Sequence, residues 1–96
     1  MSNKSKTDEL TFLPNIGKVV AKQLKDIGIN TASELKSVGS ENAFLRLQAI
    51  DEGACINLLM GLEGAIQGIR WDNLDESCKT NLRVFHKQSQ MNIKKK

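Results

Sequence analysis

The sequence predicts an all-α fold, a compact bundle of five to six helices that packs around one core. Apolar residues recur at three- and four-residue spacing along most of the chain, and no alternating run is long enough for a strand. Glycine or proline stands between successive helical patterns, which is typical of short helices joined by tight turns. The 96 residues form one domain at most, which is long enough to bury a core without disulfides or metals.

The first two helices are defined by a proline, a capping residue and a glycine. Residues 8–12 (DELTF) form a short first helix, which Pro14 ends because proline disfavours helical geometry at the residue before it. Asn15 is expected to cap a second helix, which stops at Gly28. The core positions of that helix recur at helical spacing: Ile16, Val20, Leu24 and Ile27.

The third and fourth helices are expected on either side of Gly39. Thr31 and Glu34 have the spacing of a capping box, which predicts a short third helix that Gly39 ends. Ser40 is expected to cap a fourth helix that runs to residue 50.

The fifth helix is expected to be the central element. Asp51 would cap it, and it would cover residues 52–69. From residue 54 to residue 69 its only charge is Glu63, so most of its circumference should be buried. Glu63 is expected to meet a partner from another helix or a solvent edge, and Trp71 to plug the core. A last helix is expected at residues 76–87.

The domain is expected to span residues 8–88, between a mobile polar tail of residues 1–7 and a basic tail of residues 89–96. The formal net charge is +3, but five of the 14 basic residues are lysines in these tails. Without them the body has nine basic and 11 acidic residues, a net charge of −2. Only a local basic patch, and not the overall charge, could therefore support nucleic-acid binding.

Composition and motifs exclude several classes of protein. The longest apolar run, residues 54–62, is too short to span a bilayer, and the N-terminus has no signal peptide, so we expect a cytoplasmic protein without membrane contact. One histidine, no nucleotide-binding glycine loop and no metal-ligand spacing predict a non-enzyme without cofactor, metal or small-molecule substrate. Cys55 and Cys78 are expected to be buried or half-buried small hydrophobes.

The chain contains an internal repeat, in which one sequence pattern recurs after 22 residues. Residues 13–21 and 35–43 both have a hydrophobe, two residues, a hydrophobe, glycine, three residues and alanine. Glycine permits a sharp turn, and alanine permits the next helix to approach closely. The repeat predicts tandem helix–hairpin–helix-like units that share a core.

The first of these hairpins is a candidate phosphate site. In such units the hairpin N–H groups lie at the electropositive N-terminus of the second helix, where an anion fits. Glu41 would repel a phosphate at the second hairpin, and the alternative for the first is that its lysine stripe is only a solvated helix face. Contacts of this kind reach no base edges, so binding would be weak and independent of sequence. The candidate residues are Asn15, Ile16, Gly17, Lys18, Lys22 and Lys25.

Three glycines of the fifth helix form a second candidate surface. Gly61, Gly64 and Gly68 lie along one helical face, and each lowers helix stability by about 1 kcal/mol relative to alanine. Their presence indicates that something approaches this face closely. The occupant would be another helix of the same domain or a second copy of the chain in a homodimer.

The string LPNIGKVVAKQLKDIGI at residues 13–29, followed by AFLRL and LLMGLEGAIQGIRWDNL, resembles the C-terminal domain of the TfoX/Sxy family of bacterial competence regulators. The resemblance covers residues 13–82. It implies a compact helical bundle related to helix–hairpin–helix modules, which acts in transcription regulation of DNA-uptake genes. In that family the domain usually follows an N-terminal α/β domain, whereas only a short tail precedes Leu13, so we expect a free-standing copy.

Two functions follow from these expectations. The first is a non-enzymatic regulatory module with weak, sequence-nonspecific DNA binding through the first hairpin. The alternative is a protein–protein interaction domain that contacts the transcription machinery or a second copy of itself, without DNA.

Overall fold

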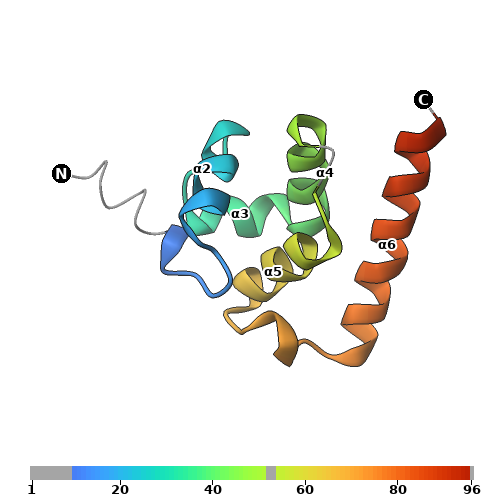
Figure 1. Ribbon diagram of the computed structural model, residues 1–96. Helices are drawn as coiled ribbons and strands as arrows, with labels where there is room; N and C mark the ends of the chain where they lie inside the picture. The colour runs from blue at the N-terminus through green and yellow to red at the C-terminus, as the bar shows by residue number, and fades with distance from the viewer. Residues whose placement is uncertain (1–9, 52–53, 96) are drawn as a thin grey trace.

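The computed structural model describes residues 10–51 and 54–95, with side chains to residue 91. The described residues contain helices and no strands, which confirms the all-α prediction (Figure 1). Leu10 and Thr11 are helical and precede the first complete element. Five α-helices and one 3-10 helix follow: α2 (Lys18–Asp26), α3 (Ala32–Val38), α4 (Ser40–Ile50), α5 (Ile56–Gln67), η1 (Trp71–Asn73) and α6 (Glu76–Lys95).

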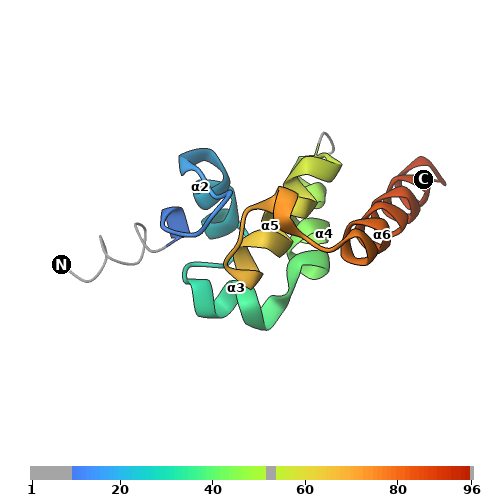
Figure 2. The same ribbon diagram turned by 90° about the horizontal axis from the view of Figure 1, so that it is seen from below.

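Helix α5 lies at the centre of the fold, as the sequence predicts. It packs against α3, α4, η1 and α6, and in Figure 2 it lies with α4 between α2 on one side and α6 on the other. Its apolar composition allows burial on most sides, and Leu59 and Leu62 have no exposed surface. Phe44 is the one aromatic residue among the buried core, which is otherwise aliphatic apart from Met60.

The capping box and both predicted glycine stops are confirmed. The Thr31 hydroxyl accepts from the Glu34 N–H at 3.1 Å, and the Glu34 carboxylate accepts from the Thr31 N–H at 3.2 Å. Gly28 and Gly39 both have positive φ, 91° and 89°, a conformation that glycine adopts without steric cost. Helices α2 and α3 therefore end where expected.

Two expected N-caps are wrong because each side chain is used elsewhere. Gly17, and not Asn15, is the N-cap of α2. Gly39, and not Ser40, is the N-cap of α4, since Ser40 is already helical and its hydroxyl donates to Glu63 Oε1 at 2.6 Å. Glu63 thus has a partner from another helix.

Helices α5 and α6 differ in length from the prediction. Asp51 does not cap α5: its N–H bonds to the Leu47 carbonyl and closes the last turn of α4. The N-cap of α5 is Cys55, and residues 52–53 of the expected start lie outside the described residues. Helix α6 runs to Lys95, beyond the expected end at Lys87.

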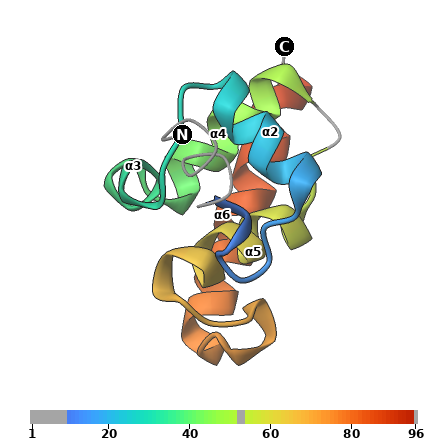
Figure 3. The ribbon, with the colours of Figure 1, turned by 90° about the vertical axis from the view of Figure 1, so that its left-hand side faces the viewer.

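A buried polar contact accompanies the extension of α6. Ser89 is buried and its hydroxyl donates to the His86 carbonyl at 2.7 Å and accepts from Gln48 of α4 at 3.2 Å. In Figure 3, seen from the α2 side, α6 passes behind the other helices from the η1 end to the opposite end of the molecule. The polar segment from residue 89, which the sequence predicts as a tail, belongs to α6 as far as Lys95.

The two repeated segments, residues 13–21 and 35–43, pack alike but differ in backbone geometry. Their aliphatic and alanine positions all belong to the core or pack against it. Their glycines differ, however: Gly17 is extended with φ −95°, and Gly39 has φ 89°. In the first segment the positive φ lies two residues earlier, at Asn15. The helix–hairpin–helix interpretation is therefore not confirmed. None of the described helices combines the length and apolar character that crossing a bilayer requires.

Candidate nucleic-acid interface

The lysines of α2 lie on its exposed face. Lys18, Lys22 and Lys25 are exposed, whereas Ala21 and Leu24 of the same helix are buried in the core. The helix is amphipathic, and its lysines follow one another at four- and three-residue spacing, which places them on one side. Residues 10–25 contain these three lysines and no acidic residue, and the exposed Asp26 follows at the end of α2, one turn after Lys22. This face is therefore locally positive although the body of the protein is not.

The N-terminus of α2 presents unsatisfied amide groups. The first backbone hydrogen bond of the helix joins the Ala21 N–H to the Gly17 carbonyl at 2.9 Å, so residues 18–20 have no intrahelical acceptor. Among the residues that the structure describes, no side chain caps this end, and the first turn contains no acidic residue. Gly17 is exposed and a Cβ there would meet no atom within 4 Å. An anion could approach this helix end closely, and the helix dipole would favour it.

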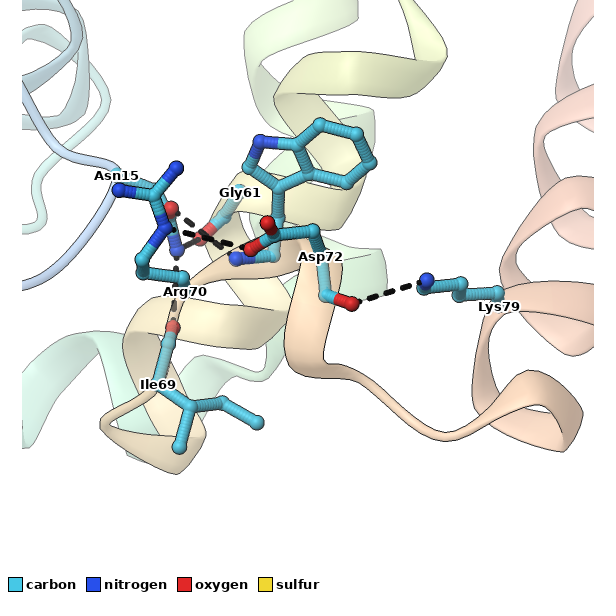
Figure 4. A network of polar contacts seen from close by, with 7 residues as sticks. Asn15, Gly61, Ile69, Arg70, Asp72 and Lys79 are labelled. Atoms are coloured by element: carbon cyan, nitrogen blue, oxygen red, sulfur yellow. Dashed lines mark hydrogen bonds and ion pairs between the residues drawn. The ribbon is translucent and has the colours of Figure 1, made fainter.

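Asn15 fastens the loop before α2 to the middle of α5 and to the segment that follows α5 (Figure 4). Its backbone is left-handed, with φ 70°, which asparagine tolerates better than most residues. Its Nδ2 donates to the Gly61 carbonyl at 3.3 Å and to the Ile69 carbonyl at 3.1 Å, and its Oδ1 accepts from the Trp71 N–H at 3.2 Å. We call this set of contacts the Asn15 clasp.

Two predicted site residues are engaged in hydrogen bonds within the protein. All of these contacts lie within the protein, so the Asn15 side chain holds the loop in place and both its amide donor and its oxygen are already engaged. Ile16 is buried, and its N–H donates to the Leu13 carbonyl at 3.3 Å, so its amide is already used. The candidate phosphate donors that remain are the amides of Gly17 and Lys18 and the lysine side chains.

The glycines of α5 are explained by the same clasp. Gly61 and Gly64 are buried, and a Cβ on Gly64 would lie 2.6 Å from Asn15 Nδ2 and 2.8 Å from the Ile69 carbonyl oxygen. The close approach that the glycines indicate is therefore made by the loop of this chain and not by a helix or a second copy. Gly68 lies beyond the helical face, as the left-handed C-cap of α5 with φ 78°. These three glycines do not form an exposed interaction surface.

The second glycine turn has an acidic environment. The N-terminus of α4 borders a cleft of about 520 Å³, whose walls include Glu41 and Glu63. The Glu63 carboxylate accepts from Ser40 at 2.6 Å and from Gln67 at 2.7 Å. Carboxylates thus lie at the positive N-terminal end of α4, and the negative charge of Glu41 disfavours an anion there, as expected. His86 does not line this cleft, because its ring packs on Phe44 with 5.7 Å between ring centroids.

The two cysteines lie in different environments. Cys78 is half-buried, as expected, and desolvation by burial, assisted by the Glu63 charge, raises the pKa of its thiol. The thiol therefore stays protonated and is a poor nucleophile. Cys55 is exposed at the start of α5, so the expectation that it is buried is wrong. Within the described residues no group of His, Cys, Asp or Glu has the arrangement of a metal site.

Trp71 is exposed, contrary to the prediction that it plugs the core. Its exposed fraction is 41%, and Leu74, three residues later, is buried at 4% and occupies the core in its place. Lys79 Nζ lies 6.0 Å from the indole centroid and donates to the Asp72 carbonyl at 3.1 Å. Arg70 forms an ion pair with Asp72 at 3.3 Å. The sequence gives no signal for this exposure, since tryptophans after apolar helices are usually buried.

Comparison with known proteins places the chain in a family. The family model of the TfoX C-terminal domain matches residues 6–86. The chain belongs to the TfoX C-terminal domain family. The matched residues of this TfoX C-terminal domain include the candidate interface on α2 and the Asn15 clasp.

Two crystal structures from Listeria monocytogenes have the same fold. One, described as an uncharacterized protein in a triclinic form, is 52% identical with a TM-score of 0.82, and the match covers 82% of this chain and 90% of that one. The other, described as a protein of unknown function in a tetragonal form, is 51% identical with a TM-score of 0.82, over 83% of this chain and 99% of that one. A search of curated proteins gave no significant match.

Proposed function

We propose that this TfoX C-terminal domain is a non-enzymatic regulatory module that binds DNA weakly and without sequence preference. One observation supports the proposal most directly: α2 presents Lys18, Lys22 and Lys25 on its exposed face, after an N-terminus whose first turn contains no acidic residue. The role that we assign is transcription regulation in the bacterial cytoplasm. The regulated process would be DNA uptake, which the family resemblance implies.

The proposed contact is with the sugar-phosphate backbone. One phosphate would lie at the N-terminus of α2, where it would accept from the amides of Gly17 and Lys18 and pair with the Lys18 ammonium. Lys22 lies about one helical turn further on, where it would reach a neighbouring phosphate. Because none of these groups reaches a base edge, binding would not depend on sequence. Three lysines and one helix end give few contacts, so the binding would be weak and sensitive to salt.

The combined variant Lys18→Glu, Lys22→Glu, Lys25→Glu is expected to weaken binding to an arbitrary duplex by at least roughly tenfold at low salt. Fluorescence anisotropy with a labelled duplex at two or more salt concentrations measures this effect. If each lysine neutralises one phosphate, the wild-type slope of log K against log salt should be about −2.7.

A charge-matched control separates a local site from general attraction. The variant Lys36→Glu, Arg46→Glu, Lys87→Glu makes the same change in net charge at exposed positions of α3, α4 and α6. It should retain most of the binding, as should a chain without residues 94–96. Equal losses in both triple variants, or no loss in either, would contradict a site on α2.

A second candidate function is a contact with another protein, either the transcription machinery or a second copy of the chain. Phe12 and Val19 favour it, because they are 83% and 72% exposed and lie on either side of the loop before α2. For a second copy, light scattering should show a dimer that Phe12→Ser returns to monomer, with no effect of the lysine variant on assembly. A monomer at every concentration would contradict self-association.

A further inference from the structure

The loop before α2 depends on one side chain for its polar contacts. Residues 12–17 have the sequence FLPNIG, in which Asn15 is the one residue whose side chain can form hydrogen bonds. Its amide and its oxygen make the three contacts of the Asn15 clasp, to Gly61, Ile69 and Trp71 (Figure 4). Side-chain hydrogen bonds from this loop therefore all come from Asn15.

The partners of Asn15 belong to the central helix and to the segment that follows it. Gly61 is buried in α5, and the Ile69 N–H donates to the Gly64 carbonyl at 2.9 Å, which holds the following segment against the end of α5. Gly64 permits this close approach, since a Cβ there would lie 3.2 Å from the Trp71 nitrogen. The clasp thus joins the loop to the helix that packs against α3, α4, η1 and α6.

One buried residue separates the clasp from the proposed phosphate site. Ile16 is buried and follows Asn15 directly, and the next residue is Gly17, the N-cap of α2. Glycine has access to more backbone conformations than other residues, so Gly17 does not by itself fix the direction of its own N–H or of the Lys18 N–H. These directions depend on what holds the chain on either side, which is α2 after Gly17 and the Asn15 clasp before it.

We propose that Asn15 is a positioning residue for DNA binding, which holds the amides of Gly17 and Lys18 in the orientation that a phosphate requires. The inference rests on the proposed function and deepens it, because it names the contact that sets the affinity of the same site. A loop that is already ordered binds more tightly than one that its ligand must order, because its entropy is lost on folding and not on binding. By linkage, DNA that binds the ordered loop must stabilise the clasp by the same factor.

The first test compares the wild type with Asn15→Gly. Glycine permits the left-handed backbone at this position but removes all three hydrogen bonds of the clasp. In fluorescence anisotropy with a labelled duplex at low salt, the variant should bind roughly three- to tenfold more weakly. It retains Lys18, Lys22 and Lys25, so the slope of log K against log salt should stay that of the wild type.

The variant Ser89→Ala is the control for a loss of stability alone. It removes the buried hydrogen bond between Ser89 and Gln48, which joins α6 to α4 and involves no residue of α2. It should unfold at a lower temperature than the wild type and should still bind the duplex with the affinity of the wild type. Thermal unfolding of both variants identifies a binding temperature at which each is folded.

The second test measures hydrogen exchange of the Trp71 N–H, which donates to Asn15 Oδ1 at 3.2 Å and is not among the proposed phosphate donors. Saturating duplex should slow this exchange in the wild type, by a factor no larger than the affinity that Asn15→Gly loses. The Gly39 N–H, which donates to the Leu35 carbonyl at 2.9 Å, is the reference and should not change. In Asn15→Gly the duplex should leave exchange at Trp71 unchanged, which separates coupling through the clasp from direct cover by DNA.

The outcomes separate the inference from the proposed function. If the wild type does not bind the duplex, both fail. If the wild type binds and the triple lysine variant does not, but Asn15→Gly binds as well as the wild type or Ser89→Ala loses as much as Asn15→Gly, then Asn15 does not position the site and the lysine site stands. Exchange at Trp71 that does not slow in the wild type, or that slows equally in Asn15→Gly, would overturn the inference in the same way.

Discussion

Replacing Asn15 with alanine is expected to lower the free energy of unfolding by about 2–3 kcal/mol. The change removes three hydrogen bonds, each with a net contribution of about 1 kcal/mol or less where it is exposed. It also places alanine at φ 70°, where a residue other than glycine or asparagine adds about 1 kcal/mol of strain. For a domain of this size the melting temperature should fall by roughly 10–20 °C.

The variant Asn15→Gly provides the matched control for the backbone. Glycine adopts a positive φ without strain but cannot make the hydrogen bonds, so it should be intermediate between the wild type and Asn15→Ala. Urea unfolding followed by circular dichroism measures all three proteins. If Asn15→Ala were as stable as the wild type, the loop before α2 would not depend on the clasp.

Replacing Gly64 with alanine is expected to lower the free energy of unfolding by about 2 kcal/mol. The new methyl group would lie 2.6 Å from Asn15 Nδ2 and 2.8 Å from the Ile69 carbonyl oxygen, and the second of these is a backbone atom that cannot rotate away. Overpacking of this kind usually costs about 1–3 kcal/mol or more, and only about 1 kcal/mol returns from the higher helix propensity of alanine.

Gly61 is the matched control, one turn earlier in α5. A Cβ there would lie 3.4 Å from Asn15 Cβ, an ordinary contact. Gly61→Ala should therefore be neutral or more stable by up to about 1 kcal/mol. The double variant Asn15→Ala, Gly64→Ala should be more stable than the sum of the two single effects predicts, because the closest contact is gone. If Gly61→Ala and Gly64→Ala had the same effect, the contact between the clasp and Gly64 would not limit stability.

The order of the helices could be predicted from local signals. The capping box at Thr31 and Glu34 and the turn at Gly28 act within a few residues, and the low charge of α5 determines its burial directly. Predictions failed where a side chain has a distant partner. The Ser40 hydroxyl bonds to Glu63 of α5, so Ser40 is not the N-cap of α4. Gln48 bonds to Ser89 of α6, in the part of α6 that extends beyond the predicted end.

Only part of the candidate site could be predicted, because its remaining contacts also join residues that are distant in the sequence. The exposed lysines and the end of α2 follow from a helical pattern and a glycine. The clasp joins residues 46 to 56 positions apart, and asparagine is common both at N-caps and in left-handed turns. Gly61 and Gly64 gave the one signal of a close approach, without identifying Asn15 as the residue that approaches. The exposure of Trp71 follows from its link to Asn15 and from the burial of Leu74, neither of which has a local signature.

A titration of ¹⁵N-labelled protein with a short DNA oligomer, followed by amide chemical shifts, tests directly whether DNA binds at the start of α2. The largest shifts are expected at Gly17, Lys18 and the following residues of α2. Shifts confined to the turn at Gly39 or to the end of α6, or no shifts at any residue, would contradict a DNA interface at the start of α2.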